Sequence, residues 1–384
     1  MLRVHLQVIC SQAEKGTIVP KGDSSSLPIL IPKLLVLRTF NLFSELTTMY
    51  EKDYHSQDLG GSSFLVTGGA GFIGSHIAEY LLNKGAGKVR VLDNFSTGSR
   101  ENIEDFRRFG SFEMMEGDIT DLDTCVQAMQ GVDYVLHQAA LGSVPRSIND
   151  PITTNQVNVN GFLNILVAAR DAKVKRMVYA ASSSTYGDHP ALPKVEHEIG
   201  SPLSPYAVSK YINELYASVF SRTYGFHTIG LRYFNVFGPR QNPKGPYAAV
   251  IPLFIKAAMN GEPALINGDG QTSRDFTFVE NVVQANIRAA FAPLDKHDVV
   301  NVACGGMTSL NDLWKMISAS LNVNIPPTYA PPRTGDIKHS LASIEKAKKL
   351  FGYEPFIEMK DGLKETIRWG KLSGNRQANG NGQR

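Results

Sequence analysis

The segment TGGAGFIG, residues 67–74, decides the fold expected for this chain. It follows a short apolar run, residues 64–66, and precedes apolar residues that recur at helical spacing, so its glycines lie between a strand and a helix. There Gly68 can form a tight turn, Gly71 lets backbone N–H groups approach a phosphate, and Gly74 allows the helix to pack closely on the strand. The positive end of the helix dipole adds to this attraction for anions. The segment therefore predicts a loop that holds the pyrophosphate of a dinucleotide.

A second apolar strand ends in an acidic residue. Residues 89–92 read VRVL, and Asp93 follows them, about twenty residues beyond the last glycine of the loop. A carboxylate at this point accepts hydrogen bonds from the hydroxyl groups of the adenosine ribose and repels a 2′-phosphate. The sequence thus predicts NAD as the cofactor.

The alternation of strand and helix continues along the chain. Further elements of this kind are expected as strands at 112–115, 134–136 and 177–181 and as helices at 121–129 and 154–171. Regular βαβ units imply a parallel sheet that is covered by helices on both faces. We therefore expect an α/β fold with a Rossmann-type doubly wound sheet.

Composition divides the chain into four parts. Residues 1–60 lack the pattern of the remainder and are expected to be a poorly ordered extension, either sequence upstream of a true start at Met49 or a targeting or interaction segment. Residues 61–235 are expected to form mainly the NAD-binding domain. Residues 236–372 are expected to form mainly a smaller α/β substrate domain, with some exchange of chain between the two. Residues 373–384 are rich in Gly, Asn, Gln and Arg, which predicts a disordered tail.

The overall composition is that of an ordinary globular protein. The 384 residues are 42% hydrophobic and 20% charged, with a net charge of +3. No run of like charge favours nucleic acid or a membrane surface as a partner. The three cysteines form no CxxC pattern, which is typical of inert thiols in a reducing compartment. We therefore expect a cytoplasmic protein without a metal ion.

Two polar motifs supply candidate catalytic groups. The strand at 177–181 stops at three serines, Ser182 to Ser184, and ligands of doubly wound sheets gather at such carboxyl ends of strands. Farther on, SPYAVSK places Tyr206 and Lys210 at i and i+4, on one face of a helix. A nearby ammonium and the positive nicotinamide ring would lower the pKa of a tyrosine from about 10 toward neutrality. Each motif alone is as consistent with a turn or a solvated surface, but their order along the chain suits one active site.

These residues resemble the extended short-chain dehydrogenase/reductases and, within them, the nucleotide-sugar 4-epimerases. The resemblance covers residues 64–369 and is closest to bacterial UDP-N-acetylglucosamine 4-epimerases that also act on the corresponding uronic acid. The strings that carry it are HQAALGSVPRSINDPIT, YAASSSTYGDHP, SPYAVSK, LRYFNVFGPRQ, YAAVIP and INGDGQTSRDF.

The resemblance implies a role for each matching residue. Tyr206 would be the catalytic base, Lys210 its helper and a ligand of the nicotinamide ribose, and Ser182 the hydroxyl partner at the sugar O4, with Ser183 beside it. The cofactor would be lined by Tyr206 and Lys210 together with Gly68, Gly71, Phe72, Ile73, Gly74, Asp93, Asn94, Asp118, Ile119 and Gln138. The UDP-sugar would contact Ser182 and Ser183 together with Ser143, Asn235, Ala249, Val250, Asn267, Arg274, Arg333, Asp336 and Ser340.

Two departures from related enzymes narrow the expected chemistry. Related dehydratases and decarboxylases carry carboxylates where this chain has Ser183 and Ser184, so the resemblance implies reversible oxidation at C4 without elimination. Galactose-restricted epimerases carry a bulky residue where this chain has Ser340, in the loop RTGDIKHS, so a small residue there implies room for an N-acetyl group.

The resemblance therefore implies an isomerase that epimerises a UDP-N-acetylhexosamine, UDP-GlcNAc/UDP-GalNAc or the uronic acid forms, at C4 for polysaccharide biosynthesis. It would work by transient oxidation to a 4-keto sugar. A UDP-glucose or UDP-glucuronate 4-epimerase is the alternative within this class, and a non-catalytic NAD-sensing protein is the alternative outside it. The resemblance also implies a homodimer that pairs the helices at 154–171 and 206–224.

Overall fold

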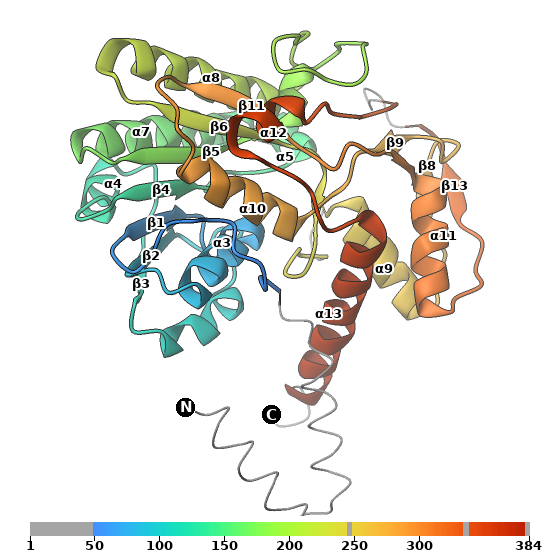
Figure 1. Cartoon of the computed structure of the whole chain (residues 1–384). Coiled ribbons are helices and arrows are strands. Elements are labelled where there is room, and N and C mark those ends of the chain that lie inside the picture. The colour runs from blue at the N-terminus through green and yellow to red at the C-terminus, as the bar shows by residue number, and fades with distance from the viewer. Residues whose placement is uncertain (1–48, 244–247, 333–337, 381–384) are drawn as a thin grey trace, which may run out of the picture. The chain divides into compact units, whose positions relative to one another are not determined.

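The computed structural model describes residues 49–243, 248–332 and 338–380. Residues from Tyr50 onward form one compact unit (Figure 1). Among the described residues, no helix combines the length and the apolar character needed to cross a membrane.

A parallel sheet of seven strands forms the centre of this unit, which confirms the predicted α/β doubly wound fold. The strand order is β11-β6-β5-β4-β1-β2-β3, so the sheet grows outward in both directions from the pair β1 and β4. Ligands of such sheets bind at this switch point, beside the carboxyl ends of the strands. The strands are β1 (Ser63–Thr67), β2 (Lys88–Asp93), β3 (Phe112–Glu116), β4 (Tyr134–His137), β5 (Arg176–Ser182), β6 (Thr228–Tyr233) and β11 (Asp298–Val302).

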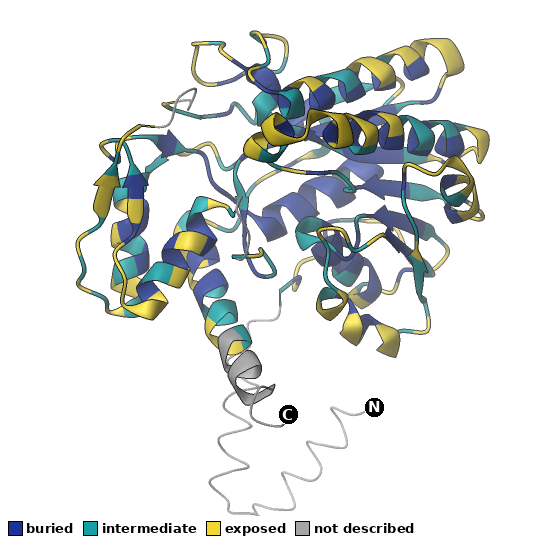
Figure 2. Ribbon diagram, turned by 180° about the vertical axis from the view of Figure 1, so that it is seen from behind, coloured by how far each residue is buried: buried dark blue, intermediate teal, exposed yellow. Residues whose placement is uncertain are grey.

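Helices cover both faces of the sheet (Figure 1). One layer contains α3 (Phe72–Asn83), α10 (Val279–Ala290) and α12 (Glu345–Phe351), and the other contains α4 (Leu122–Ala128), α7 (Phe162–Asp171) and α8 (Pro205–Tyr224). The strands are buried between these layers, whereas the outer helix surfaces are exposed (Figure 2). The second layer packs on the sheet through a continuous apolar core that includes Leu65, Phe162, Leu166, Met177 and Tyr179.

The long helix α8 begins and ends where its sequence requires. Ser204 is the N-cap, and its hydroxyl accepts a hydrogen bond from the N–H of Ala207. Pro205 occupies the first turn, where its missing N–H costs nothing. Gly225 closes the helix in the left-handed conformation, with φ of 65°.

The helix predicted at 154–171 consists of several segments. These are the end of α6 (Pro151–Asn155), the π-helix η3 (Gln156–Gly161) and α7, and a separate short helix, α5 (Val144–Asn149), precedes them. A Cβ at Gly161 would lie 2.7 Å from the Ile119 side chain, so glycine is required where η3 packs on the loop after β3. The wider π turn thus occurs where this helical run passes the switch point of the sheet.

The C-terminal part adds helices and short strand pairs beside the sheet (Figure 1). Its helices are α9 (Val250–Asn260), α11 (Leu310–Leu321) and α13 (Met359–Gly380). Its strand pairs are β10 (Thr277–Phe278) with β7 (Val236–Phe237), β12 (Thr308–Ser309) with β9 (Ser273–Arg274), and β13 (Thr328–Ala330) with β8 (Leu265–Asn267). The remaining elements are the 3-10 helices η1 (Arg100–Asn102), η2 (Glu104–Arg108) and η4 (Ser183–Tyr186).

The structure revises both predicted end segments. Residues 1–48 lie outside the described residues, but Tyr50, Tyr54 and Leu59 are buried, so the packed fold begins earlier than residue 61. Glu280 on α10 holds this segment by accepting hydrogen bonds from the N–H of Tyr50 and the hydroxyl of Tyr54. At the other end, α13 continues through Gly380, whereas composition predicted disorder from residue 373.

Candidate active site

The glycine segment forms a close turn between β1 and α3. Gly68 has φ of 65°, and a Cβ there would lie 2.7 Å from the backbone nitrogen of Ala139. A Cβ at Gly74 would lie 2.2 Å from the carbonyl oxygen of Gly68. Any side chain at either position would therefore push apart β1, β4 and the first turn of α3. The N-terminus of α3 remains directed at the cavity lined by Gly71, Phe72 and Ile73.

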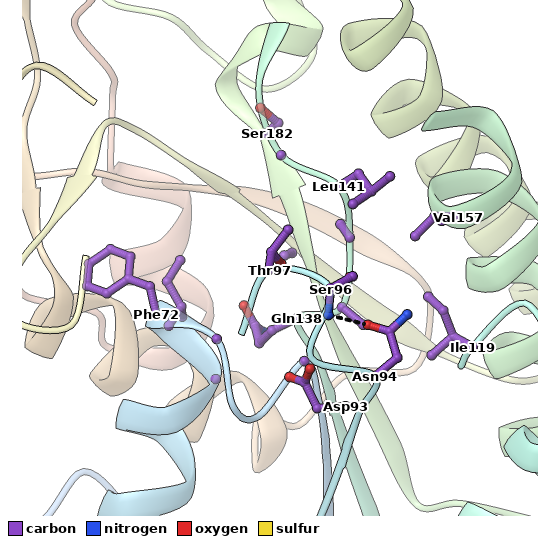
Figure 3. Close-up of a pocket in the computed structure, with 18 of the residues that line it drawn as sticks. Phe72, Asp93, Asn94, Ser96, Thr97, Ile119, Gln138, Leu141, Val157 and Ser182 are labelled. Carbon is purple, nitrogen blue, oxygen red and sulfur yellow. Dashed lines mark hydrogen bonds between the residues drawn. The ribbon is translucent and has the colours of Figure 1, made fainter. Parts of the chain in front are cut away.

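Asp93 closes the same turn from the end of β2. Its carboxylate accepts hydrogen bonds from the N–H of Ala70, at 2.9 Å, and of Phe95, at 2.8 Å. Burial raises the pKa of Asp93 above its ordinary value, although these N–H groups act in the opposite direction. The side chain still lines the cavity, so the carboxylate both fixes the loop and faces a ligand (Figure 3).

Asn94 and Asp118 form the outer wall of this cavity. The side-chain amide of Asn94 donates to Asp118 at 2.7 Å. The side-chain carbonyl oxygen of Asn94 accepts the N–H of Ser96 (Figure 3). Burial opposes ionisation of Asp118, but hydrogen bonds from Thr120 and Asn94 outweigh it and lower the pKa of this carboxyl. Ile119 adds an apolar surface beside them.

Gln138 is held by a closed ring of three hydrogen bonds. Its amide donates to Asn286 at 3.1 Å, Asn286 donates to the hydroxyl of Tyr233 at 2.8 Å, and Tyr233 donates to the carbonyl oxygen of Gln138 at 3.1 Å. Every donor in the ring therefore has an acceptor, which fixes the orientation of the Gln138 amide. Gln138 and Tyr233 both line the cavity, and both are hydrogen-bonded to Asn286 of α10. The helix α10 therefore fixes the position of this part of the cavity wall.

The three predicted catalytic groups meet at the carboxyl end of β5. Ser182 ends β5, and the first turns of α8 place Tyr206 and Lys210 in the same cavity. Ser182 hydrogen-bonds Tyr206, and the ammonium of Lys210 donates to the carbonyl oxygen of Ala180 at 2.8 Å. Ser183 begins η4 next to Ser182 but is not among the residues that line this cavity.

Burial shifts the pKa of both α8 groups toward their neutral forms. It lowers the pKa of Lys210 to about 8. It also raises the pKa of Tyr206 above 10, against the opposing hydrogen bond with Ser182. The lowered pKa predicted from the sequence depends on the positive nicotinamide ring of bound NAD together with Lys210. In the protein alone, burial acts on the phenol in the opposite direction, and the Lys210 ammonium donates to the carbonyl oxygen of Ala180.

A buried ion pair fixes how α8 faces the sheet. Glu214 follows Lys210 by one further turn and receives two hydrogen bonds from Arg232 of β6, at 2.9 and 2.7 Å. The Arg232 guanidinium also lies 4.7 Å from the centre of the Tyr186 ring and donates to the carbonyl of Glu196. A bidentate pair of this kind resists rotation of the helix that carries Tyr206.

A second cavity adjoins the first. Both cavities are lined by Asn235 and Val236, just beyond β6. The second has a volume of about 570 Å³, within the range of small-molecule sites. Of the predicted substrate residues, those that line it are Asn235, Ala249, Val250, Asn267 and Arg274.

The other predicted substrate residues have different positions. Ser143 is the N-cap of α5 and has φ of 101°, a conformation that L-residues rarely adopt and that is typical of functional sites. Ser340 donates its N–H to the carbonyl of Ser273, beside Arg274, but lines neither cavity. Arg333 and Asp336 lie outside the described residues.

Sequence reasoning overlooked several residues of the first cavity. Ser96, Thr97, Leu141, Val157 and Tyr233 line it beside the predicted set. Tyr233 ends β6, so the rule that ligands gather at the carboxyl ends of strands would have identified it. The remaining four lie in loops and at a helix turn, for which no comparable rule exists.

The first cavity fits a bound dinucleotide. All twelve residues predicted to line the cofactor belong to it. Gly68, Gly71 and Gly74 keep the turn free of side chains, which brings the α3 N-terminus close to a diphosphate. Asp93 offers an acceptor for ribose hydroxyls, and Lys210 is a buried cation at the end of the cavity that holds Ser182 and Tyr206. NAD is therefore the cofactor that these residues hold.

Comparisons with known proteins agree with this geometry. Residues 64–303 match the model of the NAD dependent epimerase/dehydratase family. A UDP-glucose 4-epimerase of Mycolicibacterium smegmatis is 36% identical over 79% of this chain and 97% of its own length. The solved UDP-N-acetylglucosamine 4-epimerase of Methanobrevibacter ruminantium, in complex with UDP-N-acetylmuramic acid, is 40% identical, with a TM-score of 0.77 over 81% of this chain and 98% of its own. The Thermus thermophilus UDP-glucose 4-epimerase in complex with NAD is 35% identical, with a TM-score of 0.72 over 80% of this chain and 99% of its own.

Replacement of Gly68 by alanine should lower NAD affinity at least tenfold, because the new Cβ would meet the Ala139 backbone at 2.7 Å. Gly131→Ala is the matched control, since Gly131 has a similar φ of 68° but open space around its Cβ position. The control should lose only about 1–2 kcal/mol of unfolding free energy, the cost of the backbone conformation. Calorimetric titration with NAD and denaturant unfolding measure the two effects. Equal NAD affinity in both variants would contradict the assigned loop.

Proposed function

The chain belongs to the NAD-dependent epimerase/dehydratase family, and on that premise we propose that it interconverts the C4 epimers of a UDP-N-acetylhexosamine. UDP-sugar 4-epimerisation, an isomerase reaction, is the activity named for several relatives with this fold. The observation that carries the proposal is the meeting of Ser182, Tyr206 and Lys210 in a cavity that shares a wall with a second one.

The side chains can move the proton that this reaction requires. Tyr206, as phenolate, takes the proton of the sugar O4 directly or through Ser182, with which it is hydrogen-bonded. Bound NAD supplies the acceptor and donor of the C4 hydride. The charge of Lys210 at the same end of the cavity supports the phenolate electrostatically once its ammonium turns from Ala180. Return of the hydride to C4 on the opposite face of the 4-keto sugar would then yield the C4 epimer.

The polar residues near Ser182 favour epimerisation over elimination. Ser183 and Ser184 follow it, and neither can act as the carboxylate acid that an elimination needs. Among the described residues that line the first cavity, the carboxylates are Asp93 and Asp118, at the ends of β2 and β3 away from Tyr206. Reversible oxidation and reduction at C4 is the chemistry that remains.

The acetamido group is the finer part of the proposal and depends on Ser340. This residue is joined to Ser273, which precedes Arg274 of the second cavity. A small side chain there leaves space for a group at C2 of the sugar. The names of relatives that act on UDP-glucose or UDP-glucuronate favour those sugars as the second candidate.

We also infer that two copies of the chain pair through one helical face. Large apolar side chains are exposed on α5, α6 and α8 and just before α8, as a dimer surface requires. The sequence-based expectation included α7, whereas the exposed residues belong to its neighbours. They are Val144, Ile148, Ile152, Leu203, Val208, Leu215, Tyr216 and Val219.

Replacement of Tyr206 by phenylalanine should lower kcat about 10²- to 10⁴-fold, because the variant lacks the group that accepts the O4 proton. The bound NAD content should stay near that of the wild type, since the ring still fills its place in the cavity wall. Turnover of UDP-GlcNAc and chromatography of released NAD measure these two properties. Near-normal turnover in the variant would refute the role of Tyr206.

Ser340→Tyr should lower turnover of UDP-GlcNAc at least about a hundredfold, because a bulky ring excludes the acetamido group. Turnover of UDP-glucose should stay unchanged, since this sugar has no acetamido group. Ser340→Ala is the control and should convert both. The assay offers UDP-sugars with and without the acetamido group and with and without a C6 carboxylate. If the wild type converts UDP-glucose or UDP-glucuronate in preference to UDP-GlcNAc, the proposed substrate is wrong. If it binds NAD but converts none of these sugars, a non-catalytic NAD-sensing protein becomes the better description.

Ile152→Asp should convert the dimer to a monomer, since this side chain is 71% exposed on α6 and a buried charge at an interface is costly. Val126→Asp, at an exposed apolar site on α4, should not change the assembly. Sedimentation velocity separates the two states. A monomeric wild type, or an unchanged dimer in Ile152→Asp, would contradict this interface.

A further inference from the structure

Ser184 folds back onto Ser182 at the catalytic end of the first cavity. β5 ends at Ser182, and η4 begins at the next residue. This turn places the Ser184 Oγ 2.8 Å from the Ser182 Oγ and the Ser184 N–H nitrogen 3.2 Å from the same oxygen. Ser184 thus makes two contacts with the single oxygen atom that also hydrogen-bonds Tyr206.

The chemistry of a hydroxyl group limits what Ser182 can then do. A serine hydroxyl has one hydrogen to donate and two lone pairs to accept with. The N–H and O–H of Ser184 both donate to Ser182, so together they occupy both lone pairs. The one hydrogen of Ser182 is left to donate to the oxygen of Tyr206. Donation in this direction stabilises a phenolate, whereas acceptance from Tyr206 would stabilise the neutral phenol.

We propose that Ser184 is a positioning residue, which directs the Ser182 hydrogen toward Tyr206 and so prepares the base for the O4 proton. This rests on the proposed function only for the role of Tyr206 as base. Because both lone pairs of Ser182 are engaged, the phenolate takes the hydrogen of the sugar O4 directly, so one O–H bond breaks at O4 and one forms at Tyr206 while Ser182 keeps its hydrogen. Ser184 keeps its own hydrogen throughout, and the return step reverses the path.

The same geometry explains why a hydroxyl suits position 184. An ionised carboxylate only accepts hydrogen bonds, so at this position it would draw the Ser182 hydrogen away from Tyr206. Ser184→Asp should therefore impair the base more than Ser184→Ala does, although aspartate is polar and alanine is not. Ser184→Thr keeps a hydroxyl and should behave as the wild type.

Other charged and titratable groups lie on α8 and on the elements that pack against it, and they must stay constant in a test. Lys210 lies one turn along α8, and Arg146 lies on α5, which packs against α8. Tyr186 ends η4, and the pair Arg232 and Glu214 joins β6 to α8. Position 184 can be changed without altering any of them.

The test compares pH profiles of kcat for the wild type, Ser184→Ala, Ser184→Thr and Ser184→Asp. In Ser184→Ala the acidic limb should move up by about one pH unit, because the phenolate loses its directed donor, so kcat at neutral pH falls about tenfold and recovers at high pH. KM and NAD content should not change. Ser184→Thr should restore the profile, and Ser184→Asp should shift it farther than Ser184→Ala.

A readout without turnover separates this inference from the proposed function. Ultraviolet difference titration of the NAD-bound protein, with Tyr206→Phe as the blank, follows the ionisation of Tyr206 directly. An upward shift in Ser184→Ala supports the inference even if no UDP-sugar is converted, which would refute only the proposed function. An unmoved titration, or a loss of kcat that is equal at every pH, would overturn the positioning role. Failure of Ser184→Thr to restore the titration would overturn it as well.

Discussion

The site depends on the buried contact between α8 and the sheet. Tyr206, Lys210 and Glu214 are spaced by four residues and form one stripe along this helix. Glu214 pairs with Arg232, Lys210 donates to the carbonyl of Ala180, and Tyr206 reaches Ser182. Each contact joins the helix to β5 or β6, so a rotation of α8 would break all three at once. The ion pair holds the register in which the proposed catalytic groups meet.

The sheet supplies the other half of this arrangement. Because its strands are parallel, their carboxyl ends meet along one edge, and the glycine turn after β1 lies beside the end of β4. The Cβ positions at Gly68 and Gly74 show how little space separates these segments. A cofactor bound there is brought alongside the group at the end of β5. The same edge then continues through Asn235 into the second cavity.

Local patterns in the sequence predicted these elements well. The glycine turn, the acidic end of β2 and the Tyr206–Lys210 spacing depend on residues close together in the chain, and the structure has each at the expected place. Contacts between distant segments were not predictable in this way. The ring that orients Gln138 uses Asn286, far along the chain, and the pKa of Tyr206 depends on how deeply the fold buries it. Burial is a property of the whole packing, which no spacing rule contains.

We propose that bound NAD takes the hydrogen of C4 from a UDP-sugar and returns the same hydrogen to C4. Its most direct test is proton NMR of UDP-GlcNAc deuterated at C4, incubated with the purified protein and no added NAD. We predict that UDP-GalNAc forms and that the deuterium stays at C4. Loss of the label to water, or no conversion of any UDP-sugar, would contradict the account.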